Sequence, residues 1–387
     1  MGSSVHIAAA AHLGAASGNF LIFEFPSTPN PIGDGLLTHW LRPEGGMLTV
    51  PMGPGLGITF DDEAFGRHAI KVSQRGQEMD RFEMARPYVG VFTIPPTPFL
   101  ETGEIDEVSL RRCLDFCVLA GAHGIVIGVN ASEAIALTDL ERMSVAEITI
   151  EHVDHRVPVV IGVSGVLTAS SVQFAAHART SGADSVIAMP PYVRHPPGDE
   201  NFDFYAAVAA AVEGIPVWIQ DYVGPVGTPM SIALLARMIN KIECVDFVKE
   251  ETALAPQVIT AVREAVGDRV RGGMAGRYLM EEAFRGACGT MPACEVTDAH
   301  VAVWNAIEAR DEPEARRLHT HLLPLLNDEA MYSFTIYKEV LVRRGVIASA
   351  TTRVPGAGRL DTANHRELDI LLDDLTPLLT LGLRPNF

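Results

Sequence analysis

A lysine at the end of an apolar run is the first candidate for chemistry in this sequence. Lys249 closes the run VDFVK. If this run is a strand of a parallel sheet, burial of the amine disfavours the ammonium form and leaves a nucleophile that can attack a carbonyl carbon. The alternative is a structural lysine paired with an internal carboxylate, and the spacing alone does not separate the two.

Two glutamates follow this lysine directly. Side chains alternate along a strand, so Glu251 shares a side with Lys249 and Glu250 points to the other side. Glu251 can therefore move protons in the cavity that Lys249 faces. An ion pair with no further role is an equal alternative for Glu251.

The segment GVNASE (128–133) follows another apolar run. Its small residues permit close approach of the backbone, and Asn130 and Ser132 offer hydrogen bonds. Such a loop can hold a carboxylate through backbone N–H groups. An ordinary turn in which both residues act as caps is an equal alternative.

Two tyrosines lie at the ends of other runs. Tyr222 follows Gln220 and Asp221, and Tyr192 closes MPPY. A phenol both donates and accepts a hydrogen bond, so either could relay protons. A buried tyrosine that only satisfies its own hydroxyl is the commoner case.

Short apolar runs recur from residue 88 onward, each followed by an amphipathic stretch, and predict the elements that position these residues. Continuous apolar strands alternating with helices indicate a parallel sheet with both faces covered. Eight such units predict an α/β fold, a (β/α)8 barrel over residues 85–295. An open doubly wound sheet is the alternative, but no GxGxxG follows the first run. The runs are 88–93, 124–129, 157–163, 184–190, 215–221, 245–250, 269–273 and 289–293.

The segments on either side of this region differ from it. Residues 1–84 are rich in Gly and Pro, and we predict a small N-terminal appendage with one helix near 4–16 and one strand at 19–24. Residues 296–387 predict a helical C-terminal region. Its helical patterns lie near 296–310, 312–327, 332–345 and 364–381.

Composition excludes several classes of function. The net charge of −18 disfavours nucleic acid and membrane surfaces as partners. The number of cysteines, five, is odd, and they include no CxxC pair. We therefore expect no disulfide framework and no zinc site, and we expect the protein to be cytoplasmic. His152 and His155 sit in a basic turn, EHVDHR, and we do not expect them to bind metal.

The candidate residues together resemble one family, the Schiff-base barrels related to dihydrodipicolinate synthase and N-acetylneuraminate lyase. The resemblance spans about residues 88–358 and implies a (β/α)8 barrel, an imine between the lysine and a small 2-oxo acid, and a homo-oligomer, usually a tetramer. Its landmarks are TPF (97–99), GVNASE with LTDLER (137–142), GADSVIAMPPY (182–192), IPVWIQD (215–221), FVKEE (247–251), GTMPA (289–293) and YKEVLVRRG (337–345).

Departures from the family pattern narrow the expected reaction. The usual GTTGE loop reads VNASE here, the usual tyrosine of the fifth strand falls at Gln220, and the arginine that recognises the synthase's second substrate falls at Pro225. The loop NxSE, with IQD, KxE and GTMP, instead resembles the L-2-keto-3-deoxyarabonate dehydratase subgroup. In that subgroup the carboxylate two residues after the lysine transfers protons, a role that carries over to Glu251. The expected substrate contacts are Asn130, Ala131, Ser132, Tyr192, Gln220, Asp221 and Met291.

Residues 1–75 resemble the C-terminal end of an enolase-superfamily sugar-acid dehydratase, through AAAAHLGAASGNFLIFEFP, NPIGDGL and VPMGPGLGI. The fragment lacks that family's metal ligands and most of its barrel, so we interpret it as a fusion remnant. Those dehydratases make 2-keto-3-deoxy sugar acids, which supports this substrate class by association.

The sequence therefore predicts a Schiff-base-forming lyase for a 2-keto-3-deoxy sugar acid, most simply a dehydratase with Lys249, Glu251 and Tyr222 as catalytic residues. We expect no cofactor and no metal. A class I aldolase for the same substrates, a dihydrodipicolinate synthase-like enzyme, a non-enzymatic 2-oxo-acid sensor and an inactive fusion product stay open as alternatives.

Overall fold

The computed structural model describes residues 88–382, with gaps at 194–195, 223–226 and 273–275, and scattered positions between 8 and 59. The chain divides into two compact units, residues 1–84 and 85–387. In the first unit, helical residues occur between 8 and 16, within the helix predicted there, and the strand predicted at 19–24 lies outside the described residues.

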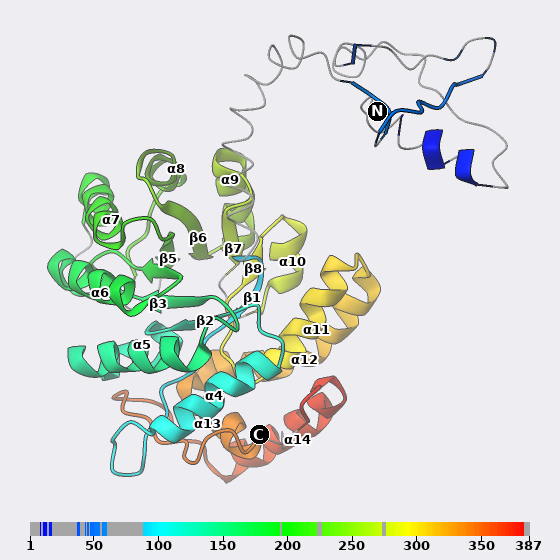
Figure 1. Ribbon diagram of the computed structural model, residues 1–387. Coiled ribbons are helices and arrows are strands. Elements are labelled where there is room, and N and C mark those ends of the chain that lie inside the picture. Colours follow the sequence, from blue (N-terminus) through cyan, green and yellow to red (C-terminus); the bar gives the residue numbers. More distant parts are fainter. Residues whose placement is uncertain are drawn as a thin grey trace. The chain divides into compact units, whose positions relative to one another are not determined.

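Eight parallel strands form one sheet in the second unit (Figure 1), in the order β7-β6-β5-β4-β3-β2-β1-β8. Each strand overlaps one of the eight predicted apolar runs. Between the two ends of this order, the Cys288 N–H donates a hydrogen bond of 2.8 Å to the Val270 carbonyl. The strands are β1 Gly90–Thr93, β2 Gly124–Ile127, β3 Val159–Gly162, β4 Ser185–Ala188, β5 Val217–Tyr222, β6 Val245–Glu251, β7 Val270–Gly272 and β8 Gly289–Thr290.

Helices alternate with the strands and lie along one side of the sheet (Figure 1). Among the described residues, no helix is long and apolar enough to cross a membrane. The helices between strands are α4 Glu107–Leu119, α5 Asp139–Val153, α6 Thr168–Ser181, α7 Gly198–Val212, α8 Ile232–Lys241, α9 Ala255–Val266 and α10 Leu279–Phe284. After β8 follow α11 Thr297–Glu308, α12 Glu312–Tyr332, α13 Phe334–Arg343, α14 Thr362–Leu375 and the short turn η4 Thr376–Leu378.

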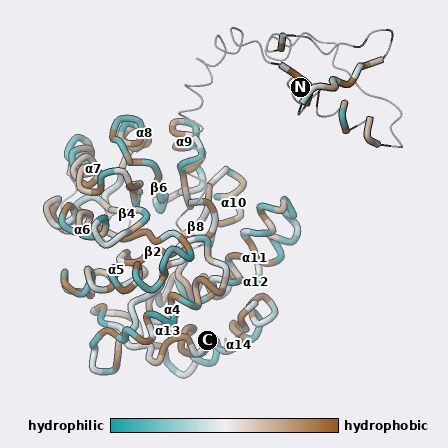
Figure 2. The backbone as a smooth tube through the Cα atoms, viewed as in Figure 1, coloured by the Kyte–Doolittle hydropathy of each residue, from teal (hydrophilic) through white to brown (hydrophobic). Residues whose placement is uncertain are grey.

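Alternation along the strands builds two apolar layers, and Figure 2 shows hydrophobic residues following the strands. Val217 and Val248 pack in the layer between the sheet and the helices. Trp218 and Phe247 belong to a separate cluster formed by residues of the strands and the segments next to them, with ring centroids 4.7 Å apart. We call the side that carries this second cluster the inner face.

A buried arginine joins the helices after β8 to the segment that directly follows that strand. Arg344 donates to both Asp298 carboxylate oxygens at 2.9 and 2.8 Å, and neither side chain is exposed. The same guanidinium donates to the carbonyls of Glu295 and Gly382 at 2.8 and 2.9 Å. One side chain therefore ties the segment after β8, α11 and the C-terminal end together.

Two carboxyl groups face each other on the helix side of the sheet. Asp221 and Glu250 are register partners on β5 and β6, and both are buried. The Met230 N–H donates to Asp221 at 3.3 Å, and the Thr252 N–H donates to Glu250 at 2.9 Å. Burial, reinforced by the neighbouring Glu250, raises the pKa of Asp221 to about 8.

The buried arginine makes a direct prediction about stability. Arg344→Ala leaves the Asp298 carboxylate buried without its partner, which typically costs about 3–5 kcal/mol of unfolding free energy. Urea denaturation followed by circular dichroism measures the loss. The control is Arg317→Ala, which removes an exposed ion pair with Glu314 and should change stability little. Equal effects of both variants would contradict the fastening role of Arg344.

The Asp221 carboxyl makes stability depend on pH. Between its ordinary value of 3.8 and about 8, this group is ionised when unfolded but protonated when folded, so rising pH costs the folded state. Asp221→Asn keeps an acceptor for the Met230 N–H and removes that cost. We expect the variant's stability relative to the parent protein to rise from about pH 5 to about pH 8 in urea titrations.

The control is Asp203→Asn, at an exposed position of α7. It should leave the pH dependence of unfolding unchanged. A stability difference between Asp221→Asn and the parent protein that stays constant with pH would show that Asp221 is ionised in the folded state.

Candidate active site

Lys249 and Glu251 form a buried ion pair at the end of β6. The Nζ atom of Lys249 lies 2.9 Å from Oε1 of Glu251, and the two side chains are only 4% and 12% exposed. The other carboxylate oxygen of Glu251 accepts a hydrogen bond of 2.7 Å from the Gln220 amide. The carboxylate of Glu251 is thus held between the Lys249 amine and the Gln220 amide. It is close enough to the amine to accept a proton from it.

The register of two neighbouring strands brings these three side chains together. Gln220 on β5 is the register partner of Lys249 on β6. Gln220 lies two residues after Trp218, and Lys249 two residues after Phe247, so alternation places both on the inner face. The shared side predicted for Lys249 and Glu251 follows from the same alternation.

The segment after β2 folds into a tight turn at the inner face. Asn130–Ser132 forms a 3₁₀ turn, and Glu133 ends it in the left-handed region at φ 59°. Ala131 packs against the inner-face cluster. Thr97 donates a hydrogen bond of 2.7 Å to the Ser132 carbonyl, while the buried Ser132 hydroxyl has no hydrogen-bond partner among the described residues.

A second buried ion pair anchors this turn to the C-terminal region. The Glu133 carboxylate contacts the Lys338 ammonium, with both side chains fully buried. Thr352 donates to the same carboxylate at 2.5 Å, and Lys338 donates to the Thr351 carbonyl at 2.7 Å. Burial lowers the pKa of Lys338 to about 8. The turn after β2 is therefore held by residues more than two hundred positions later in the chain.

The remaining predicted residues divide between the inner face and other positions. Tyr222 is the register partner of Glu251, and burial and that carboxylate raise its pKa. Met291 is buried in the inner-face cluster. Tyr192 is partly exposed after β4. Asp221 lies on the helix side, which does not favour the predicted substrate contact.

Three further residues around the site did not stand out in the sequence. Thr97 belongs to the landmark TPF, but its bond to the turn after β2 depends on the fold. Lys338 lies in a helical landmark far from the strands. Glu282 on α10 is fully buried, and burial with the nearby charge of Glu251 raises its pKa to about 8. Its place in a short helix gave no sign of burial.

Pro225, where the synthases carry an arginine, lies outside the described residues. One group of side chains in the described part of the chain has the spacing of metal ligands, and it contains Cys113, Cys117 and Cys294. None of the predicted site residues belongs to that group.

Comparison with protein families divides the chain into two matches. Residues 87–374 match the model of the dihydrodipicolinate synthetase family. Residues 1–64 match the enolase C-terminal domain-like model. The second match agrees with the resemblance inferred for the N-terminal segment.

Individual proteins similar to this chain also include enzymes with the names of this family and of a sugar-acid dehydratase. An L-2-keto-3-deoxyarabonate dehydratase of Azospirillum brasilense is 35% identical over 297 residues, which cover 75% of this chain and 95% of that protein. A 4-hydroxy-tetrahydrodipicolinate synthase of Acidiphilium cryptum is 35% identical over 157 residues, or 41% of this chain and 53% of the synthase.

A solved dihydrodipicolinate synthase of Rhodopseudomonas palustris has a TM-score of 0.69 at 27% identity, covering 74% of this chain and 97% of that one. The parallel α/β sheet, the lysine at the end of β6 and these similarities lead to one conclusion: from residue 87 to 374, the chain belongs to the dihydrodipicolinate synthetase family.

Proposed function

We propose that this protein is a Schiff-base-forming lyase that removes water from a 2-keto-3-deoxy sugar acid. The observation that carries the proposal is the triad on the inner face. Glu251 lies 2.9 Å from the Lys249 amine, and its second oxygen is held by Gln220 at 2.7 Å. A carboxylate in this position can take protons from the amine and from a carbon next to an imine. The 35% identity to a named dehydratase supports the same reaction.

The first step makes the imine. Glu251 takes a proton from the Lys249 ammonium, and the neutral amine attacks the C2 carbonyl carbon of the substrate. The resulting carbinolamine loses its hydroxyl as water, using the proton that Glu251 returns, and leaves a cationic iminium. The iminium then withdraws electrons from C3.

The second step expels the C4 hydroxyl. Glu251 removes a proton from C3, and the electron pair moves through C2 to nitrogen, giving an enamine. The nitrogen pair then returns, the C3–C4 double bond forms, and the C4 hydroxyl leaves as water with the proton from Glu251. Hydrolysis of the iminium frees Lys249, so the net change is the loss of one water. For a pentonate, migration of the double bond toward C5 gives a terminal aldehyde.

The turn after β2 supplies the binding site for the substrate carboxylate in this proposal. Its small residues, Asn130 and Ala131, let an anion reach the backbone N–H groups. The unpartnered Ser132 hydroxyl is a further donor for a carboxylate or a sugar hydroxyl. A buried polar group without a partner is costly, and a bound substrate would satisfy it.

Tyr222 supports a second candidate, the aldolase reaction. It is the register partner of Glu251, and its phenol is half-buried beside that carboxylate. A base that removes the C4 hydroxyl proton would break the C3–C4 bond, releasing an aldehyde and leaving pyruvate on the lysine. The products distinguish the two reactions.

The proposal includes several statements about the whole chain. We infer that the sheet closes into a (β/α)8 barrel through β7 and β8, as the Cys288–Val270 hydrogen bond suggests. We also propose a cytoplasmic homo-oligomer and an N-terminal remnant without the enolase-type chemistry. Light scattering of the purified protein tests the oligomer.

The reaction is tested by its products. Proton NMR with 2-keto-3-deoxypentonates and 2-keto-3-deoxyhexonates should show a 2-oxo acid semialdehyde from the pentonate. Lys249→Ala should give no product. Pyruvate with a short aldehyde would establish the aldolase instead. Calorimetric binding of the substrates without any product would favour a sensor.

The role of Glu251 is tested by separating imine formation from turnover. Glu251→Gln removes the proton acceptor and keeps an acceptor for Gln220, so kcat should fall by about 10²–10⁴. Water can replace Glu251 as proton carrier in imine formation but not in proton abstraction from C3, so borohydride reduction followed by mass spectrometry should still trap a 2-oxo acid on Lys249, at a lower rate. The control is Glu243→Gln at an exposed position near the start of β6, which should turn over normally. Normal turnover by Glu251→Gln would show that Glu251 is not the residue that transfers protons.

A further inference from the structure

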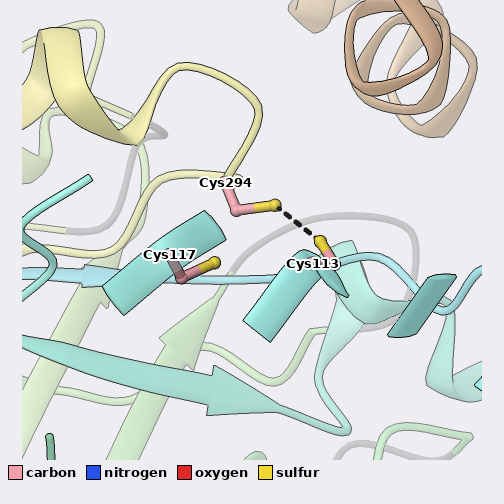
Figure 3. Close-up of side chains that lie close together, drawn as sticks. All are labelled: Cys113, Cys117 and Cys294. Carbon is pink, nitrogen blue, oxygen red and sulfur yellow. Dashed lines mark hydrogen bonds between the residues drawn. The ribbon is translucent and has the colours of Figure 1, made fainter. Parts of the chain in front are cut away.

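Three of the five cysteines converge in the core, although Cys294 is far from the other two in the sequence (Figure 3). Cys113 and Cys117 lie one turn apart on α4, and Cys294 follows β8, 181 positions after Cys113. All three side chains are fully buried. Cysteine spacing alone predicts no metal site here, because the convergence arises only when the segment after β8 packs on α4.

The three sulfur atoms have the separation of ligands to one ion. All lie within 4.8 Å of one another, and the Sγ atoms of Cys113 and Cys294 are 3.4 Å apart. A triangle with these sides has a point within about 2.6 Å of each sulfur, against a typical metal–thiolate bond of about 2.3 Å. Side-chain shifts of a few tenths of an ångström would bring the sulfurs to bonding distance.

The donor set selects the class of ion. Three sulfur ligands suit soft ions and exclude magnesium and calcium, which require oxygen. Zinc and iron–sulfur clusters take four protein ligands in structural sites, and this group supplies three. Monovalent copper accepts thiolates in a trigonal arrangement and needs no fourth ligand.

A buried ammonium lies close to this cluster. Lys338 is near enough to Cys113 for its positive charge to act on that sulfur. It would offset part of the net negative charge that three thiolates around one monovalent ion carry.

We propose that Cys113, Cys117 and Cys294 form a trigonal binding site for monovalent copper. The ion would join the segment after β8 to the helix after β1. Since β1 and β8 are paired in the sheet, the ion would fasten the first and last strands at one place. An ion that binds only the folded chain raises its melting temperature by mass action.

The test uses the full chain with Cys244→Ser and Cys288→Ser, which removes the two cysteines outside the cluster. The reduced protein is titrated anaerobically with monovalent copper against a coloured copper chelator, beside zinc and magnesium. We expect one copper ion per chain, an ultraviolet thiolate-to-copper charge-transfer band and a higher Tm. Magnesium should have no effect on any of these.

Ligand variants in the same background make the test specific. Cys294→Ala and Cys117→Ala should each weaken copper binding by about tenfold or more, because loss of even an outer-shell partner costs that much. Two variants on different elements keep the test usable if one fails to fold. Unchanged affinity in a variant that folds would overturn the proposal.

Two other outcomes would also overturn it. One is the absence of stoichiometric copper binding while all three thiols are free by mass spectrometry. The other is a protein that takes up no copper but forms a Cys113–Cys294 disulfide with hydrogen peroxide, which would make the cluster an oxidation site. None of these readouts depends on the proposed lyase activity.

Discussion

The buried pair of Lys249 and Glu251 is the constraint around which the rest of the site is arranged. Removing an ammonium and a carboxylate from water costs several kcal/mol per ion, and their attraction offsets this only in good geometry. The second carboxylate oxygen therefore needs a donor, and Gln220 supplies it at 2.7 Å. A tyrosine at that position would put a phenol where this chain has an amide. A glutamine at position 220 is thus consistent with the proposal that the Glu251 carboxylate itself transfers protons.

A second buried pair explains why the C-terminal helices belong to the same unit as the sheet. Glu133 ends the turn after β2 in a left-handed conformation, and its carboxylate is neutralised by Lys338 from α13. Without α13, this charge would be buried alone beside the segment proposed to bind substrate. The Arg344–Asp298 pair attaches the end of α13 to α11, six residues after Lys338. The position of the turn after β2 therefore depends on the fold of residues beyond β8.

Sequence analysis predicted the elements well because parallel strands covered on both faces must be apolar throughout. It placed Glu251 with Lys249 because alternation is a local property of one strand. The same rule, applied to the fifth strand, separates Gln220 from Asp221, yet both were expected to contact substrate. Lys338, Glu282 and the cysteine cluster could not be predicted, since their environments come from segments brought together only by folding.

The acidic character of the chain raises the question of how the proposed substrate, a 2-oxo acid anion, could enter this site. Besides Glu251, the carboxyl groups of Asp221, Glu250 and Glu282 lie close enough to influence one another. Burial raises the pKa of both Asp221 and Glu282 to about 8, so both are largely protonated at neutral pH. Burial therefore removes negative charge behind the sheet, where it would repel substrate, and the inner face presents an amine and a carboxylate of opposite charge. Burial of these carboxyl groups on the helix side thus reduces the repulsion that a substrate anion would meet on the inner face. The residues behind the sheet would have this effect without touching the substrate.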